Sequence, residues 1–171
     1  MSFDVVPAFT KSDHYEIPDT ATTSGWTETN PKVHAEKATA ANEAYSSEWK
    51  GIVRMAKRWN QTKDKPVKPS FLLEVMAIEI LRPPFGGDFP YEFMAFFATA
   101  ADRIDEDWPD PAGLGPPVSD SMNSVARTAA KQTLSQAHYM VREAIELSRA
   151  GKNGDALRKY RELFGDLFPL S

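Results

Sequence analysis

The sequence predicts a mainly α-helical fold of the α+β class, with a short β piece at its N-terminus. Three observations support this prediction. Segments 47–61 and 121–149 repeat apolar residues at the three- and four-residue spacing of one helix face. Segment 70–81, SFLLEVMAIEIL, is apolar nearly all round, as in a helix at the centre of a core. Segment 2–9 is rich in large apolar side chains and predicts a strand.

The composition is that of a globular protein. The 171 residues suit one domain, or one domain with an appendage, and 42% of them are hydrophobic and 26% charged. The chain has no cysteine, which excludes a disulfide scaffold, thiolate zinc sites and a catalytic thiol, and which fits a reducing compartment. No apolar run reaches the roughly 20 residues of a membrane span, and the N-terminus lacks the pattern of a signal peptide. We therefore expect a cytoplasmic protein with no membrane partner.

Charge is distributed unevenly along the chain, whose formal net charge is −4. Segment 50–68 holds seven of the 20 basic residues but only one of the 24 acidic residues, Asp64. A chain that is acidic overall is poorly suited to general nucleic-acid binding, so we expect no nucleic-acid partner. One local basic face instead favours a small polyanion, such as a nucleoside triphosphate.

The β region is expected to span residues 1–29 as a small antiparallel ribbon. Strand 2–9 is followed by two weaker candidates, HYEIP at 14–18 and SGWTET at 24–29. The segments between these candidates are short and polar, as in hairpin connections.

The helical domain is expected to span residues 30–171. Asn30-Pro31 supplies a cap followed by proline at the first helical position, so a helix is predicted from there to about Tyr45. Ser46 or Ser47 is expected to cap a second helix over 47–61. The apolar face of that helix consists of Trp49, Ile52, Val53, Ala56 and Trp59, and its opposite side carries Lys50, Arg54 and Lys57.

The rest of the helical domain follows from its turn residues. The prolines of KDKPVKP (63–69) end the second helix before the central helix 70–81. The remaining predictions are a loop at 82–90, a helix from Pro90 to about Ile104, a turn-rich segment 105–120 exposed over the surface, a long helix over 121–149, a stop at the glycines of 150–155, and a last helix ending at LFGDLFP (163–169).

Several of these residues allow both a functional and a structural interpretation. Lys57 or Arg54 could clamp a triphosphate, or the basic face could be a solvated helix surface. Ser70 stands where a helix cap would be, and a helix N-terminus also offers N–H groups to phosphate. Phe71 could stack on a nucleobase or belong to the core. Glu74 lies inside the most apolar helix and must be paired, with Arg54, Lys57 or Arg82 as its partner.

Other acidic and histidine residues were weighed as metal ligands. The spacing of Asp105-Glu106-Asp107 is one that metals use, but it closes a helix, and we interpret it as a solvated helix end. The three histidines, His14, His34 and His138, are far apart and form no metal-binding spacing, so we assign them no metal. Asp4 is an acid among large apolar residues, which is explained by an outward-facing position, by a paired charge, or by a bound metal.

Eight short motifs follow one another along the chain: DVVPAF, YEIPD, GW, TNPKVH, KRWNQ, KPSFLLEV, DPAGLG and LFGDLFP. Each is weak alone, but the ordered set resembles the bacterial cGAS/DncV-like nucleotidyltransferases, relatives of the animal oligoadenylate synthetases and cGAS, over essentially the whole chain. In that family an N-terminal α/β lobe carries a Gly-Ser motif and an Asp-x-Asp pair, a last catalytic strand adds a third aspartate, and a helical lobe follows. The resemblance therefore implies the C-terminal half of such an enzyme, with a remnant of the catalytic sheet at 1–29 and the helical lobe at 30–171.

The resemblance also implies roles for particular residues. Asp4 matches the third aspartate, which helps to hold two Mg²⁺ ions. Lys57 matches the lysine that meets the donor triphosphate, and Arg54 shares its basic face. Ser70 matches a polar residue near the phosphates, and Phe71 matches the aromatic residue that stacks on the base. The implied ligands are nucleoside triphosphates, ATP among them, and Mg²⁺.

The family pattern is incomplete in one respect. No Gly-Ser motif precedes Asp4, and the Asp-x-Asp spacing occurs only at 105–107. We therefore expect a C-terminal portion of an enzyme that makes cyclic or linear oligonucleotide second messengers in antiphage signalling, inactive without an N-terminal lobe or a partner copy.

Two other hypotheses stay open. One is a non-catalytic homologue that binds nucleotides or a partner. The other is a structural helical domain that dimerises through an exposed phenylalanine-rich surface formed by Phe85, Phe89, Phe93, Phe96 and Phe97.

Overall fold

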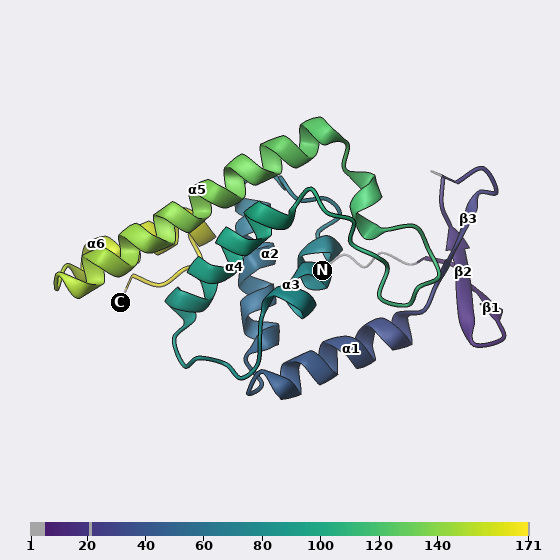
Figure 1. Cartoon of the computed structure of the whole chain (residues 1–171), viewed down its shortest axis with the longest axis horizontal. Helices are drawn as coiled ribbons and strands as arrows, with labels where there is room; N and C mark the ends of the chain where they lie inside the picture. Colours follow the sequence, from purple (N-terminus) through teal and green to yellow (C-terminus); the bar gives the residue numbers. More distant parts are fainter. Residues whose placement is uncertain (1–5, 21, 171) are drawn as a thin grey trace.

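The computed structural model describes residues 6–20 and 22–170, in which a helical body carries a small β-sheet at one end (Figure 1). The described ranges contain six α-helices, one short 3-10 helix and a three-stranded sheet. The mainly α-helical prediction with a short β piece is confirmed. In the described part of the chain, no helix is both long enough and apolar enough to cross a membrane.

The sheet is antiparallel, with strand order β1-β2-β3. Its strands are β1 (Phe9–Lys11), β2 (His14–Pro18) and β3 (Trp26–Thr29). Ser12, in the tight turn between β1 and β2, has a φ of 42°. No residue of the three strands is fully buried, so the sheet has no core of its own.

The predicted first strand, 2–9, differs from the structure at residues 6–8. Residues 1–5, and Asp4 with them, lie outside the described residues, and residues 6–8 are not in a strand. The strand begins at Phe9 instead. Pro7 explains the difference within the described range, because proline has no N–H to donate to a ladder.

Helix α1 (Pro31–Ala44) begins as predicted. The Asn30 side chain accepts a hydrogen bond from the Val33 backbone N–H at 3.4 Å, and Pro31 occupies the first turn. The Asn30 side-chain amide also donates to the Asp13 carbonyl at 2.8 Å, which ties the sheet to the start of α1.

Helix α2 (Trp49–Thr62) begins without the predicted serine cap. Ser46 and Ser47 have φ values of 55° and 67°, in the left-handed region, and form the turn after α1. Glu48 takes the cap position and makes no side-chain capping bond. The predicted apolar face of α2 is buried in full: Trp49, Ile52, Val53, Ala56 and Trp59.

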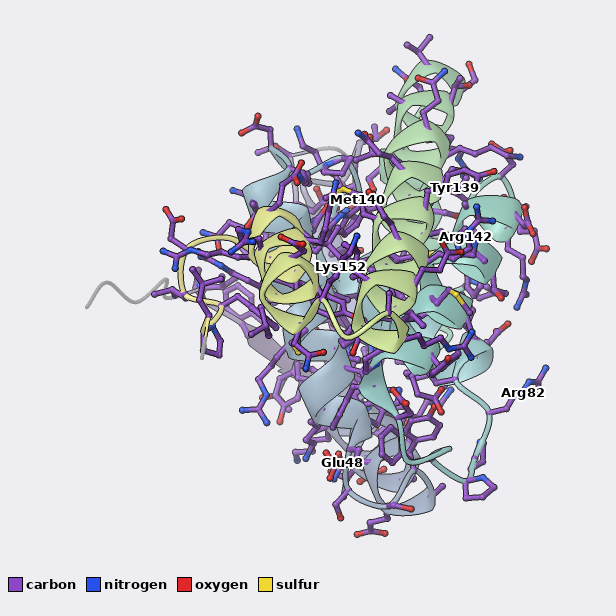
Figure 2. The ribbon with its side chains drawn as sticks, turned by 90° about the vertical axis from the view of Figure 1, so that its left-hand side faces the viewer. Glu48, Arg82, Tyr139, Met140, Arg142 and Lys152 are labelled. Atoms are coloured by element: carbon purple, nitrogen blue, oxygen red, sulfur yellow. The ribbon has the colours of Figure 1, made fainter. Side chains whose placement is uncertain are left out.

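The other helices enclose the core together with α2. They are α3 (Phe71–Ile80), α4 (Phe89–Arg103), the 3-10 helix η1 (Val118–Ser121), α5 (Ser124–Arg149) and α6 (Asn153–Phe164). Helix α5 begins three residues later than predicted, where the Asn123 side chain accepts from the Ala126 N–H at 2.9 Å. Helix α6 runs beside α5 at the end of the molecule away from the sheet, and Tyr139 and Arg142 lie along α5 in the end view (Figure 2).

The core is rich in aromatic side chains. Phe93, Phe96 and Phe97 are at most 2% exposed, and the Phe97 ring lies 4.9 Å from that of Trp59. The proposed exposed phenylalanine surface is therefore wrong for these residues, because the helix that carries them packs between its neighbours. Segment 105–120 is also less exposed than predicted: Trp108 is buried, and its indole N–H donates to the Arg103 carbonyl at 3.1 Å.

Candidate functional site

Two grooves meet at Pro69, immediately before α3. The first, here the lysine groove, has a volume of about 580 Å³ and is lined by Lys57, Asn60, Gln61, Lys65, Val67, Lys68, Pro69 and Ser70. The second, here the aromatic groove, has a volume of about 600 Å³ and lies between the sheet and the helical body. Its lining comes from three parts of the chain. The helices contribute His34 of α1 and Phe71 of α3, and the sheet contributes Ile17, Thr27, Glu28 and Thr29. The segment between α4 and α5 contributes Asp110, Gly115–Val118, Asp120 and Ser121.

Lys57 is held at the wall of the lysine groove by a carboxylate. Its ammonium donates to Glu74 of α3, so the structure selects Lys57 among the three partners considered for that acid. The two side chains keep 35% and 25% of their surface exposed, so the ion pair lies at the surface of the groove. Arg82, one of the other partners considered, points away from the body on the loop after α3 (Figure 2).

Arg54 does not share this position. It is exposed on α2, its guanidinium donates to the Lys50 carbonyl at 3.1 Å, and it lines neither groove. Of the two basic residues proposed for a triphosphate, the structure therefore brings only Lys57 to the groove.

The loop between α2 and α3 forms the rest of the lysine groove. Buried Asn60 exchanges two hydrogen bonds with the backbone of Val67, at 2.8 and 2.9 Å. Asp64 and Lys65 turn the chain with φ values of 60° and 57°. These contacts fix the loop, and Lys65 and Lys68 remain exposed along the groove.

Ser70 occupies the position before α3 but makes no side-chain capping bond, contrary to the capping interpretation. Its backbone conformation is already helical, with φ −61° and ψ −18°, so its hydroxyl is not directed back at the first N–H groups in the usual cap geometry. Ser70 is exposed and lines the lysine groove, where its hydroxyl is available to a ligand.

Phe71 is half-buried at the aromatic groove and is oriented by His34. The two rings lie 5.0 Å apart at an interplanar angle of 36°. His34 Nε2 lies 2.9 Å from Asp110 Oδ1. The other oxygen of Asp110 accepts from the backbone N–H groups of Ala112 and Leu114, at 3.1 and 3.3 Å. Helix α1, the loop at 110–114 and helix α3 are thereby joined beneath the groove.

The structure thus brings Lys57 and Ser70 together in one groove and places Phe71 in the adjoining one. Asp4 lies outside the described residues. The acids at 105–107 are exposed just beyond the end of α4, where Asp105 pairs with Lys131 and Glu106 pairs with Arg103. The roles of His34 and Asp110 were missed, although the motifs TNPKVH and DPAGLG contain them, because the partners are 76 positions apart. Across residues 6–20 and 22–170, no group of three or more histidine or acidic side chains could hold a metal ion.

The fold, a helical body with a short β piece, is shared with a solved structure. No family model matches the chain. A probable cyclic nucleotide synthase of Bacillus cereus (strain VD146) is 26% identical over 174 residues, which cover 98% of this chain and 51% of that protein. The structure of CdnC from E. coli MS115-1 with ATP superposes with a TM-score of 0.69 at 18% identity, covering 96% of this chain and 59% of CdnC.

These similarities confirm the resemblance to the cGAS/DncV-like nucleotidyltransferases. The chain spans about half the length of the curated relative that it matches.

Proposed function

We propose that this chain forms the helical side of a nucleoside-triphosphate site in an enzyme that makes cyclic or linear oligonucleotide second messengers for antiphage signalling. The observation that supports this proposal most directly is the meeting of the two grooves at Pro69. A lysine-lined groove suits the triphosphate, and an adjoining groove with an exposed aromatic edge suits the base.

Each residue has a defined part in this proposal. Lys57 contacts the triphosphate as a point charge, and Ser70 donates a hydrogen bond to a phosphate oxygen. Phe71 stacks on the nucleobase, and the neighbouring His34 ring packs against Phe71. The neutral ribose would then cross Pro69, between the charged and the aromatic side.

Magnesium belongs to the proposed enzyme, but the described residues do not form its site by themselves. Asp4 is the proposed ligand from this chain, together with two further carboxylates of a catalytic lobe. Bound Mg²⁺ would neutralise phosphate charge and lower the pKa of the attacking hydroxyl. Without that lobe we expect no nucleotide transfer.

Calorimetric titration with ATP and with inorganic tripolyphosphate tests the phosphate site. We expect Lys57→Ala to weaken the binding of both ligands by at least about tenfold, since one charge-assisted contact is lost. Lys50→Ala is the matched control, because Lys50 is exposed on the same helix and lines neither groove. Glu74→Gln should preserve or strengthen binding, because it frees the Lys57 ammonium. Binding that ignores Lys57→Ala would contradict the proposed site.

Reconstitution tests the enzymatic part of the proposal. The chain is mixed with an N-terminal lobe that carries a Gly-Ser motif and an Asp-x-Asp pair, and oligonucleotide products are followed in the presence of Mg²⁺ and nucleoside triphosphates. Product should form in the mixture and not with either part alone. A folded, associated mixture without product would contradict it.

A second candidate is a non-catalytic homologue that binds nucleotides or a protein partner. The lysine groove, which this chain forms by itself, supports this candidate. Its signature would be nucleotide binding that depends on Lys57, combined with no product from the reconstituted mixture.

A further inference from the structure

The two grooves differ in charge on either side of Pro69. Among the described residues, the lysine groove is lined by Lys57, Lys65 and Lys68 and by no acidic side chain, and Glu74 pairs with Lys57 at its wall. The described lining of the aromatic groove includes Asp19, Glu28, Asp110 and Asp120 and no lysine or arginine. Phosphates are attracted to the first groove and repelled from the second, so the charge pattern sets one direction for a bound nucleotide.

The carboxylate of Asp120 is free in the described part of the chain, unlike two of its neighbours in the groove. Asp110 is engaged with His34 and with two backbone N–H groups. Glu28 lies 3.3 Å from His14. Asp120 is exposed, and no hydrogen bond or ion pair of its side chain joins it to another described residue.

Asp120 is also well anchored beside the point where the grooves meet. It lies in η1, whose preceding turn is closed by its own N–H to the Pro117 carbonyl at 3.0 Å. Buried Ser119 accepts from the Trp108 N–H at 3.0 Å, and the Ser121 hydroxyl donates to the Lys68 carbonyl at 2.9 Å. These contacts fix the turn to the segment that leads into Pro69 and Phe71.

A carboxylate in this position can distinguish bases by the hydrogen-bond donors that they present. An ionised carboxylate only accepts hydrogen bonds. Adenine, cytosine and guanine each carry an exocyclic amino group that can donate one, whereas uracil has a carbonyl oxygen at the position of the cytosine amino group and donates only through its ring N3–H. We propose that the aromatic groove selects nucleoside triphosphates whose base carries an exocyclic amino group, with Asp120 as the specificity-determining residue. This inference rests on the proposed nucleotide site.

Two pairs of nucleotides of equal base size test the role of Asp120 in base selection. CTP and UTP form the pyrimidine pair, and ATP and ITP form the purine pair. Each pair replaces an amino group by a carbonyl. We expect the folded chain to bind CTP about tenfold more tightly than UTP in calorimetry, with ATP favoured over ITP in the same direction. Asp120→Asn turns an acceptor into a group that can also donate. The ratio of the affinity for CTP to the affinity for UTP should therefore fall to about 2 or below.

Asp102→Asn is the matched control, because Asp102 is exposed on α4, lines neither groove and undergoes the same change of charge. It should leave the ratio unchanged. Asp120→Ala removes the acceptor without adding a donor and should also lower the ratio, which guards against an effect of the asparagine itself. Equal binding of CTP and UTP by the unmodified chain, or a ratio that Asp120→Asn leaves intact, overturns the inference.

The controls separate this inference from the proposed function. If tripolyphosphate and all four nucleotides bind in a Lys57-dependent way without discrimination, only the role of Asp120 fails. If neither tripolyphosphate nor any nucleotide binds, the nucleotide site itself fails, and the inference fails with it.

Discussion

Asn60 shows how much of the site depends on one buried polar side chain. It is 1% exposed, and its amide satisfies both the N–H and the carbonyl of Val67. These bonds hold the loop that presents Lys65 and Lys68 to the lysine groove. Such a side chain stabilises the fold because it supplies the hydrogen bonds that water would otherwise give to the buried backbone.

Asn60→Ala should lower the free energy of unfolding by about 2–4 kcal/mol, because it leaves a buried donor and a buried acceptor without partners. Urea unfolding measures the change, with exposed Gln61→Ala as the control, for which the change should stay within about 0.5 kcal/mol. A loss below about 1 kcal/mol for Asn60→Ala would mean that water satisfies Val67 in place of the amide.

Single residues also mark the limit of what the sequence predicts about the site. That Glu74 must be paired follows from its apolar helix, and the structure confirms it. Which cation pairs with it depends on how α2 packs on α3, and this packing is not encoded in the spacing of either helix. The contact between His34 and Asp110 joins residues 76 positions apart, so only the folded chain displays it.

The helices and the strands predicted at 14–18 and 24–29 lie close to where the structure places them. The apolar periodicity of α2 and α5 repeats over many turns, and tertiary packing reinforces the same pattern. The predicted strand 2–9 is absent at residues 6–8, where Pro7 outweighs the apolar content of the segment. Segment 105–120 was predicted as exposed from its turn residues, but its Trp108 side chain packs into the core, which a turn-rich sequence does not exclude.

The sheet carries an ion-pair contact whose strength should depend on pH. His14 at the start of β2 lies 3.0 Å from Asp13 and 3.3 Å from Glu28 of β3. The hydrogen bond with Asp13 raises the pKa of His14 above its ordinary 6.5, with Glu28 adding to the effect and desolvation opposing it. The same bond lowers the pKa of Asp13 below its ordinary 3.8.

The sign of the pH effect follows from these directions. A histidine whose pKa is higher in the folded state stabilises the sheet fully below pH 6.5, and this contribution is lost as the pH rises through the raised value. Asp13 contributes above pH 3.8 and loses its contribution as the pH falls through its lowered pKa. We expect an NMR titration to give His14 a pKa above 6.5, returning toward that value in Asp13→Asn. A midpoint at or below 6.5 in the unmodified chain would contradict this prediction.

On the scale of the whole molecule, the protein consists of a well-packed helical body and a sheet without buried residues. The sheet joins the body through Asn30 and through the walls of the aromatic groove. Its local stability should therefore be lower than that of the helices, because few buried apolar contacts oppose its opening.

Hydrogen–deuterium exchange measures this difference directly. Amides of β1–β3 should exchange faster than those of α2–α4. Saturating ATP should slow exchange in β2 and β3, whose residues line the aromatic groove, and should leave α6, at the opposite end, unchanged (Figure 1). Sheet amides as protected as those of α2 in the absence of nucleotide would contradict the expected order of stabilities.

The placement of the four tryptophans gives this molecule a built-in optical reporter. Trp49, Trp59 and Trp108 are at most 2% exposed in the helical body, whereas Trp26 is 37% exposed on β3 beside Phe9. The red edge of the emission spectrum, and its quenching by iodide or acrylamide, should therefore come from Trp26 alone. Ligand binding or conformational change at the sheet can therefore be followed by intrinsic tryptophan fluorescence. No label is needed, and no residue of either groove has to be altered.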